Sequence, residues 1–108
     1  MNFLTRWWKN QQDYLKLSLI KADVDRRIVY VDTGEDKYRY VPRNSYGSGD
    51  CQVFAATYVQ DCWDAGFKQA DKYVFKLKDG VGHVVCIVPT DTGATWVMDV
   101  RNKAVVKG

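Results

Sequence analysis

Residues 48–58 read Ser-Gly-Asp-Cys-Gln-Val-Phe-Ala-Ala-Thr-Tyr, a polar turn containing glycine that runs directly into an apolar helix. Asp50 is a favourable N-cap residue, because its carboxylate can accept a hydrogen bond from a free N–H of the first turn. The apolar side chains that follow recur at helical spacing: Cys51, Phe54, Ala55, Tyr58, Val59 and Cys62. The pattern predicts a helix from Asp50 to about Ala65, with Gly66 as its C-terminal cap. The rest of the chain is expected to pack around this helix.

The place of Cys51 in the first turn of this helix points to chemistry. Free N–H groups and the helix dipole favour a negative charge there, so the sequence predicts a lowered pKa for the thiol and a nucleophilic thiolate. The alternative is a structural cysteine that happens to begin a helix, since cysteine is commonly a small core residue. Cys62, on the buried helix stripe, and Cys86, in a predicted strand, are expected to be structural.

Upstream of this stretch, the pattern is helical from about Leu4 to Val29. One face carries Leu17, Ile20, Val24 and Ile28. Trp7 and Trp8 lie outside this register, which leaves open a break after a separate first turn, and both are expected to pack in the core. The chain then becomes extended over residues 28–31, forms a polar loop over residues 32–36 and makes an irregular connection over residues 37–48.

Downstream, the sequence predicts a short antiparallel meander. Residues 72–78 alternate, with Tyr73, Phe75 and Leu77 on one face, and Asp79-Gly80 is a strong hairpin signal. Residues 81–88 are rich in valine and isoleucine, which suits a strand covered on both faces. A turn over residues 89–93 leads to a third strand over residues 94–100.

This meander brings together two residues that can act with Cys51. If the second turn is centred on Asp91, His83 lies directly opposite Asp99 on the same face of the sheet. An aspartate in that place fixes the tautomer of a histidine and supports its positive form. The predicted catalytic residues are therefore Cys51 as nucleophile, His83 as base and Asp99 as orienter. Each also has a structural alternative, in which Asp99 caps the turn toward Asn102 and His83 is a satisfied polar residue of the sheet.

The composition excludes several other classes. The 108 residues predict one domain, residues 1–108. A net charge of +3 without a run of five Lys or Arg argues against a nucleic-acid partner. Three cysteines without a CxxC pair, and a single histidine, argue against a disulfide framework and a zinc site. Because neither a signal peptide nor an apolar run of membrane-spanning length is seen, the expected location is the cytoplasm, without membrane association.

Three motifs in this order resemble those of the bacterial transglutaminase-like cysteine proteinases: Gly49-Asp50-Cys51, Gly82-His83-Val84-Val85 and Trp96-Val97-Met98-Asp99. Residues 24–30 with Asp32, and residues 40–42, are similar to the lead-in helix and loop of that family. The resemblance implies an α+β fold with a papain-like core. In that core an N-terminal helix and the helix carrying the cysteine pack on a small antiparallel meander that carries His83 and Asp99.

The sequence also departs from the family pattern. The family usually has Glu-Asp after the cysteine, where this chain has Gln52-Val53, so the calcium site of some members is not expected here, and neither is any other metal or cofactor. The Asp-Asn pair of the third motif is Asp99-Val100, with Asn102 displaced. The sequence also shows no secretory leader, and a compact chain without one looks like a short, phage-encoded member of the family that acts in the host cell.

The predicted function is thiol-dependent hydrolysis of an amide or peptide through an acyl-enzyme intermediate, with a peptide or protein as substrate and acyl transfer to an amine left open. The backbone N–H of Cys51 is expected in the oxyanion hole. Four nearby residues are equal candidates for a second donor: Asn44, Ser45, Tyr46 and Ser48. Two alternatives remain: an NlpC-type cell-wall endopeptidase, and a non-catalytic binding or inhibitor module that retains the fold.

Overall fold

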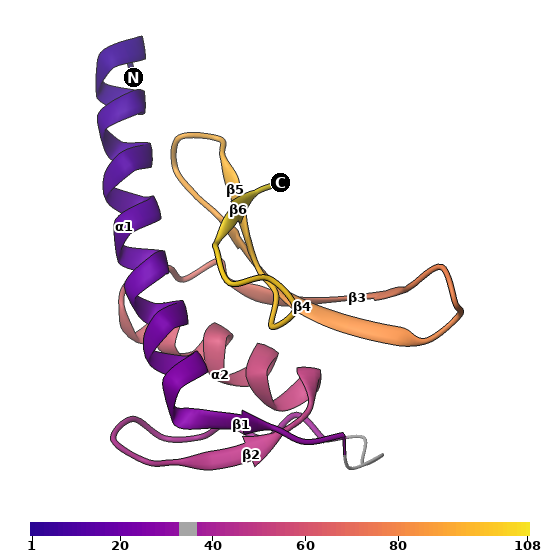
Figure 1. Ribbon diagram of the computed structural model, residues 1–108. Helices are drawn as coiled ribbons and strands as arrows, with labels where there is room; N and C mark the ends of the chain where they lie inside the picture. The colour runs from indigo at the N-terminus through magenta and orange to yellow at the C-terminus, as the bar shows by residue number, and fades with distance from the viewer. Residues whose placement is uncertain (33–36) are drawn as a thin grey trace.

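The computed structural model describes residues 1–32 and 37–108 and shows an α+β arrangement of two helices and six strands. Figure 1 shows α1 (Phe3–Arg27) as a long helix whose N-terminal turns extend beyond α2 (Cys51–Asp64). Four strands form an antiparallel sheet in the order β3 (Asp71–Lys76), β4 (Gly82–Pro89), β5 (Thr95–Met98) and β6 (Val106–Lys107). The sheet packs through β4 against α2, and α1 packs on α2.

A second, two-stranded sheet joins the end of α1 to the start of α2. Here β1 (Ile28–Tyr30) pairs in parallel with β2 (Gly47–Gly49). The extended chain predicted after the first helix is confirmed, because β-branched and aromatic residues follow Arg27. β2 was not expected within the irregular connection. Of the polar loop predicted at residues 32–36, residues 33–36 lie outside the described residues.

The first helix is continuous from Phe3 to Arg27, so the break that the sequence left open near its start is absent. Asn2 caps it by accepting a hydrogen bond from the backbone N–H of Thr5 at 2.8 Å. The predicted core face is confirmed, since Leu17, Val24 and Ile28 are buried and Ile20 is partly buried. Trp7 and Trp8 are instead exposed, and their assignment to the core is wrong.

The core lies between α2, the adjoining face of α1 and the sheet. The predicted helix around Cys51 is confirmed, including its cap at Asp50 and the left-handed Gly66 beyond its end, with φ of 101°. Cys62 and Cys86 are fully buried in this core, as expected of structural cysteines. Its other large members include Phe54, Tyr58, Val59, Val88, Trp96 and Met98.

A buried ion pair ties the two helices to the connection between them. Arg27 donates to Asp61 Oδ2 at 2.8 Å and to the carbonyl oxygen of Pro42 at 2.9 Å. Both charged side chains are almost fully buried, and Arg27 is also paired with the half-exposed Asp23 at 2.9 Å, so these ion pairs offset the hydration that the buried charges lose. The ion pair therefore fixes α2, and with it Cys51, relative to the end of α1.

The meander is confirmed, but its register differs from the prediction. Cys86 pairs with Met98 and Ile87 with Val97, which centres the second turn on Thr92 rather than Asp91. Gly93 adopts the left-handed conformation that this turn needs, with φ of 89°. The shift is two residues, so every side chain keeps its predicted face. β6, a fourth strand, was not expected.

Candidate active site

Cys51 is the first residue of α2, and its position is fixed from both sides. Asp50 accepts a hydrogen bond from the backbone N–H of Gln52 at 3.0 Å and so begins the helix. Gly49, the last residue of β2, lies so close to Val53 that a Cβ on this glycine would be 2.3 Å from a Val53 methyl carbon. Absence of a side chain at Gly49 thus allows β2 to lie against the first turn of α2.

His83 and Asp99 form a buried hydrogen-bonded pair on the sheet. His83 lies at the start of β4, and Asp99 follows the end of β5. Because of the shifted register the two are diagonal neighbours, yet His83 Nε2 is 2.8 Å from Asp99 Oδ1. The ring of Phe75, directly opposite on β3, meets the imidazole edge-on with centroids 5.6 Å apart. The pairing of His83 with Asp99 is thus present as the sequence predicted, although not in the predicted register.

Arg101 holds the other side of the Asp99 carboxylate. Its guanidinium donates to Asp99 Oδ2 at 2.7 Å, and its backbone N–H donates to Oδ1 at 2.9 Å. Burial raises the pKa of Asp99, but the hydrogen bonds from Arg101 and from His83 outweigh it and leave the pKa below its usual value. Asp99 is therefore ionised at neutral pH and only accepts hydrogen bonds. The proton of a neutral His83 consequently lies on Nε2, and Nδ1 carries the free lone pair.

Cys51 and His83 line one cavity of about 310 Å³. The thiol also lies against β4, where hydrogen bonding from the backbone of Val84 lowers its pKa. The structure therefore brings all three predicted residues to one place: Cys51 and His83 share a cavity, and Asp99 contacts His83. The other residues that line the cavity are Tyr30, Leu77, Val81, Gly82, Val100 and Arg101.

The protonation state of Cys51 differs from the sequence-based expectation. Burial raises the pKa of the thiol, and the nearby carboxylates of Asp50 and Asp99 raise it further. Hydrogen bonds from the backbone of Val84 and of Cys51 itself only partly offset these effects. The predicted lowering of the pKa is therefore wrong for the free protein, in which Cys51 is a neutral thiol. Any nucleophilic role requires a base to remove its proton.

Two residues of the site were missed by the sequence reasoning. Tyr30 comes from β1 and lines the cavity with Cys51; burial raises the pKa of its hydroxyl, which stays protonated and able to donate. Arg101 was missed although it follows the third motif by two residues. The four donors considered from the sequence are not among the described residues that line the cavity: Asn44, Ser45, Tyr46 and Ser48.

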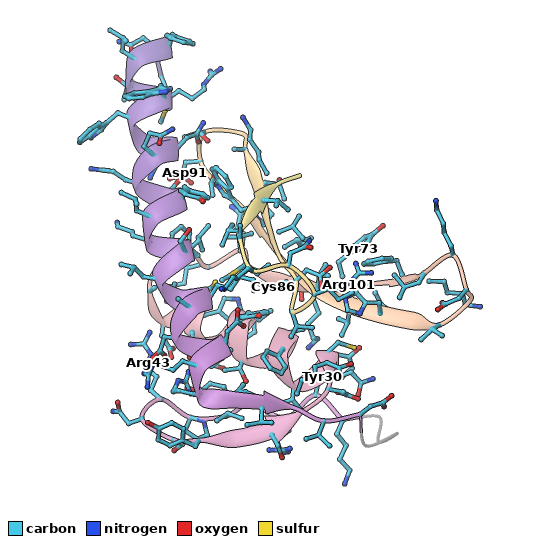
Figure 2. All side chains as sticks on the ribbon, viewed as in Figure 1. Tyr30, Arg43, Tyr73, Cys86, Asp91 and Arg101 are labelled. Carbon is cyan, nitrogen blue, oxygen red and sulfur yellow. The ribbon has the colours of Figure 1, made fainter. Side chains whose placement is uncertain are left out.

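A second, more apolar cavity of about 390 Å³ adjoins the first on the open face of the sheet. Arg101 lines both cavities, and Asp99 lines the second. Figure 2 shows Tyr73 and Arg101 close to each other at this face. The apolar side chains lining it come from three strands: Tyr73, Phe75, Val85, Ile87 and Val97. We call this second cavity the apolar groove.

The described part of the chain contains neither a metal-binding cluster nor a membrane-spanning helix. Among residues 1–32 and 37–108, no three His, Cys, Asp or Glu side chains converge as metal ligands. In the same part of the chain, neither helix combines the length and apolar character required to cross a bilayer. Comparisons with protein-family models, curated proteins and solved structures found no match to this chain.

Proposed function

We propose that the protein is a cysteine hydrolase of peptide or other amide bonds that uses Cys51, His83 and Asp99. The observation that carries the proposal is the orientation of His83. Its Nε2 is 2.8 Å from an ionised carboxylate, which leaves Nδ1 as the free ring nitrogen of a histidine that lines the same cavity as a cysteine at a helix start. This arrangement supplies a nucleophile, a base and an orienting group.

The reaction follows from these protonation states. His83 Nδ1 takes the proton of the Cys51 thiol as the sulfur attacks the carbonyl carbon, and the resulting imidazolium is stabilised by Asp99. The carbonyl oxygen becomes an oxyanion. Nδ1–H then protonates the leaving nitrogen, the C–N bond breaks and a thioester remains on Cys51. Water, deprotonated by Nδ1, attacks the thioester and restores the thiol; an amine in place of water gives acyl transfer.

The oxyanion has two candidate donors in this cavity. One is the backbone N–H of Cys51, and the other is the hydroxyl of Tyr30, whose raised pKa keeps its proton in place. Loss of one such donor typically costs about 3 kcal/mol in the transition state. Tyr30 thereby replaces the four candidates considered from the sequence.

The apolar groove favours a substrate with an aliphatic or aromatic side chain next to the scissile bond. Arg101 lines both the groove and the catalytic cavity, so a peptide that reaches across Arg101 would contact both. In this chain α2 carries the cysteine and packs on a sheet that carries the histidine and the aspartate. This arrangement agrees with a papain-like or transglutaminase-like core.

The test is acylation by p-nitrophenyl acetate followed by mass spectrometry of the intact protein and its peptides. The expected result is one acetyl group on Cys51, transient in the wild type and absent in Cys51→Ala. His83→Ala should slow its formation by roughly 100-fold or more, the usual contribution of a general base. Acetylation of Cys51 at the same rate in His83→Ala would refute the proposed role of His83.

A second candidate is a non-catalytic binding module, and the raised pKa of Cys51 favours it. In such a module the thiol stays protonated, and the ion pair of Asp99 with Arg101 is purely structural. Iodoacetamide labelling distinguishes the two candidates. In a hydrolase, His83→Ala slows alkylation of Cys51 near neutral pH, whereas in a binding module the substitution leaves the alkylation rate unchanged.

A further inference from the structure

Between Leu4 and Leu19, α1 exposes large apolar side chains on the face directed away from the rest of the molecule. Leu4, Trp8, Leu15 and Leu19 are 72%, 59%, 62% and 73% exposed. Their spacing of i, i+4, i+11 and i+15 places them in one stripe along the helix. The buried residues Leu17 and Val24 lie about half a turn away around the helix axis. We call these four residues the outer stripe.

The outer stripe is presented by a helix that is held in place. Asn10 Oδ1 accepts a hydrogen bond of 2.5 Å from the Thr92 hydroxyl, and Lys9 lies 4.0 Å from Asp91 in the same turn. Tyr14 packs against Trp96 of β5 with ring centroids 5.7 Å apart. Figure 2 shows Asp91 beside α1, where the turn between β4 and β5 reaches the helix. Since this packing fixes which face of α1 is covered, the outer stripe stays exposed in the single chain.

The spacing of the outer stripe is symmetric about the point between Gln11 and Gln12, because its four positions are separated by 4, 7 and 4 residues. When a second α1 lies antiparallel about that point, Leu4 faces Leu19 and Trp8 faces Leu15. A twofold axis requires this self-complementarity, since the same patch must serve both partners. The two glutamines lie on the flanks of the stripe at the axis, where their amides can bond to each other across the interface.

The exposed area is sufficient for such a pair. The four side chains of the outer stripe expose roughly 500 Å² per chain, so a pair that covered them fully would bury about 1,000 Å², the minimum expected of a specific interface. A lipid surface fits less well, because it would leave the amides of Gln11 and Gln12 without partners in an apolar medium. We propose that the protein forms an antiparallel dimer through the outer stripe of α1. The catalytic cavity lies on other elements and remains open in this dimer.

The register can be tested by charge substitution at Leu4 and Leu19, measured by sedimentation equilibrium over a range of micromolar concentrations. The wild type should dimerise, and Leu4→Lys or Leu19→Glu alone should weaken dimerisation by roughly 30-fold or more, as expected for loss of an anchoring side chain. The double variant should recover much of the loss, because the new charges face each other only in the antiparallel pair. The two positions are too far apart on one helix to interact within a chain.

Val74→Lys is the matched control, since Val74 is exposed on β3 and lies outside the outer stripe. It should leave the dimer unchanged, and circular dichroism should show that all variants are folded. A wild type that is monomeric at every concentration would overturn the proposal. Single variants that dimerise as tightly as the wild type would also overturn it, as would a double variant that dimerises no better than the single variants. Binding of a monomeric protein to phosphatidylcholine–phosphatidylserine vesicles would assign the stripe to a membrane instead.

Discussion

Asp50 has two opposite effects on the residue that follows it. Its carboxylate caps α2 through the backbone N–H of Gln52, which stabilises the helix that carries Cys51. Burial is the main cause of the raised pKa of the Cys51 thiol, and the same carboxylate raises it further by placing a negative charge beside the sulfur. The helix start is therefore less favourable to a thiolate than its dipole alone would indicate.

Asp50→Asn should separate these effects, because asparagine is an equally good cap but has no charge. We expect the pKa of Cys51 to fall while the helix remains intact. The measurement is the rate of iodoacetamide labelling of Cys51 as a function of pH. Asp79→Asn, in the turn between β3 and β4, is the control and should leave the profile unchanged; an equal profile for Asp50→Asn would contradict the role given to its charge.

Asp99 links the candidate site to acid stability. Its folded-state pKa lies below the unfolded value of about 3.9, so its stabilising contribution is complete above that pH and is lost as the pH falls through the folded-state pKa. In Asp99→Asn this pH-dependent contribution is absent. Urea denaturation from neutral pH to about pH 3 should therefore show a smaller loss of unfolding free energy in the variant than in the wild type. Parallel curves for the two proteins would exclude the linkage.

At the scale of elements, the contact between β2 and α2 determines the approach of the chain to Cys51. Gly49→Ala would place a Cβ within 2.5 Å of the Val53 side chain, so β2 or α2 has to shift. We expect a loss of about 1–3 kcal/mol in unfolding free energy, the usual cost of overpacking. Gly82→Ala is the matched control, since its Cβ would meet nothing within 4 Å. Equal urea midpoints for the two variants would contradict the close packing at Gly49.

The elements with strong local signals could be predicted from the sequence. The cap at Asp50, the apolar spacing of α2 and the Asp79-Gly80 turn are all local features, and each was placed correctly. The strands β2 and β6 contain only two or three residues and exist through pairing with distant partners, which no local pattern shows. The turn between β4 and β5 was misplaced by one residue because Gly93, rather than the centre of the polar segment, determines its geometry.

The candidate site shows the same division. The face shared by His83 and Asp99 was predictable, because side chains alternate along a strand and a shift of two residues preserves the face. The roles of Tyr30 and Arg101 depend on where β1 and the chain after β5 lie in space, which spacing does not reveal. The exposure of Trp7 and Trp8 was not predictable either, because α1 has two apolar faces and the sequence does not tell which is covered.

At the scale of the whole molecule, the ion pair of Arg27 with Asp61 connects both helices to the intervening chain. Asp61→Ala would leave the buried Arg27 charge with only the half-exposed Asp23 as ionic partner, and we expect a loss of about 3 kcal/mol in unfolding free energy, the lower end of the range for a broken buried pair. The exposed Asp91 offers the contrast: Asp91→Ala removes only its pairing with Lys9 and should cost less than about 1 kcal/mol. Urea denaturation of the two variants is the measurement, and similar losses would contradict a special role for the buried pair.

Stability should not depend on calcium. Near Cys51 the chain offers Asp50, which already serves as the helix cap, and Gln52 stands where a carboxylate would be needed. Thermal melting with excess chelator and with millimolar calcium should therefore give the same midpoint. A stabilisation approaching about 2.7 kcal/mol, expected when a ligand exceeds its dissociation constant a hundredfold, would contradict this prediction.

The cap of α2 also affects how Cys51 responds to oxidants. Peroxide and disulfides react with thiolates and hardly with neutral thiols. Because burial, and to a smaller extent the charge of Asp50, raise the pKa of the thiol and keep the sulfur protonated, Cys51 is protected from sulfenic acid formation and from mixed disulfides in the free protein. The sulfur becomes reactive when His83 removes its proton, a step that the proposed reaction couples to attack on a bound carbonyl. In the proposed hydrolase, burial and the charge of Asp50 would thereby preserve the nucleophile between turnovers.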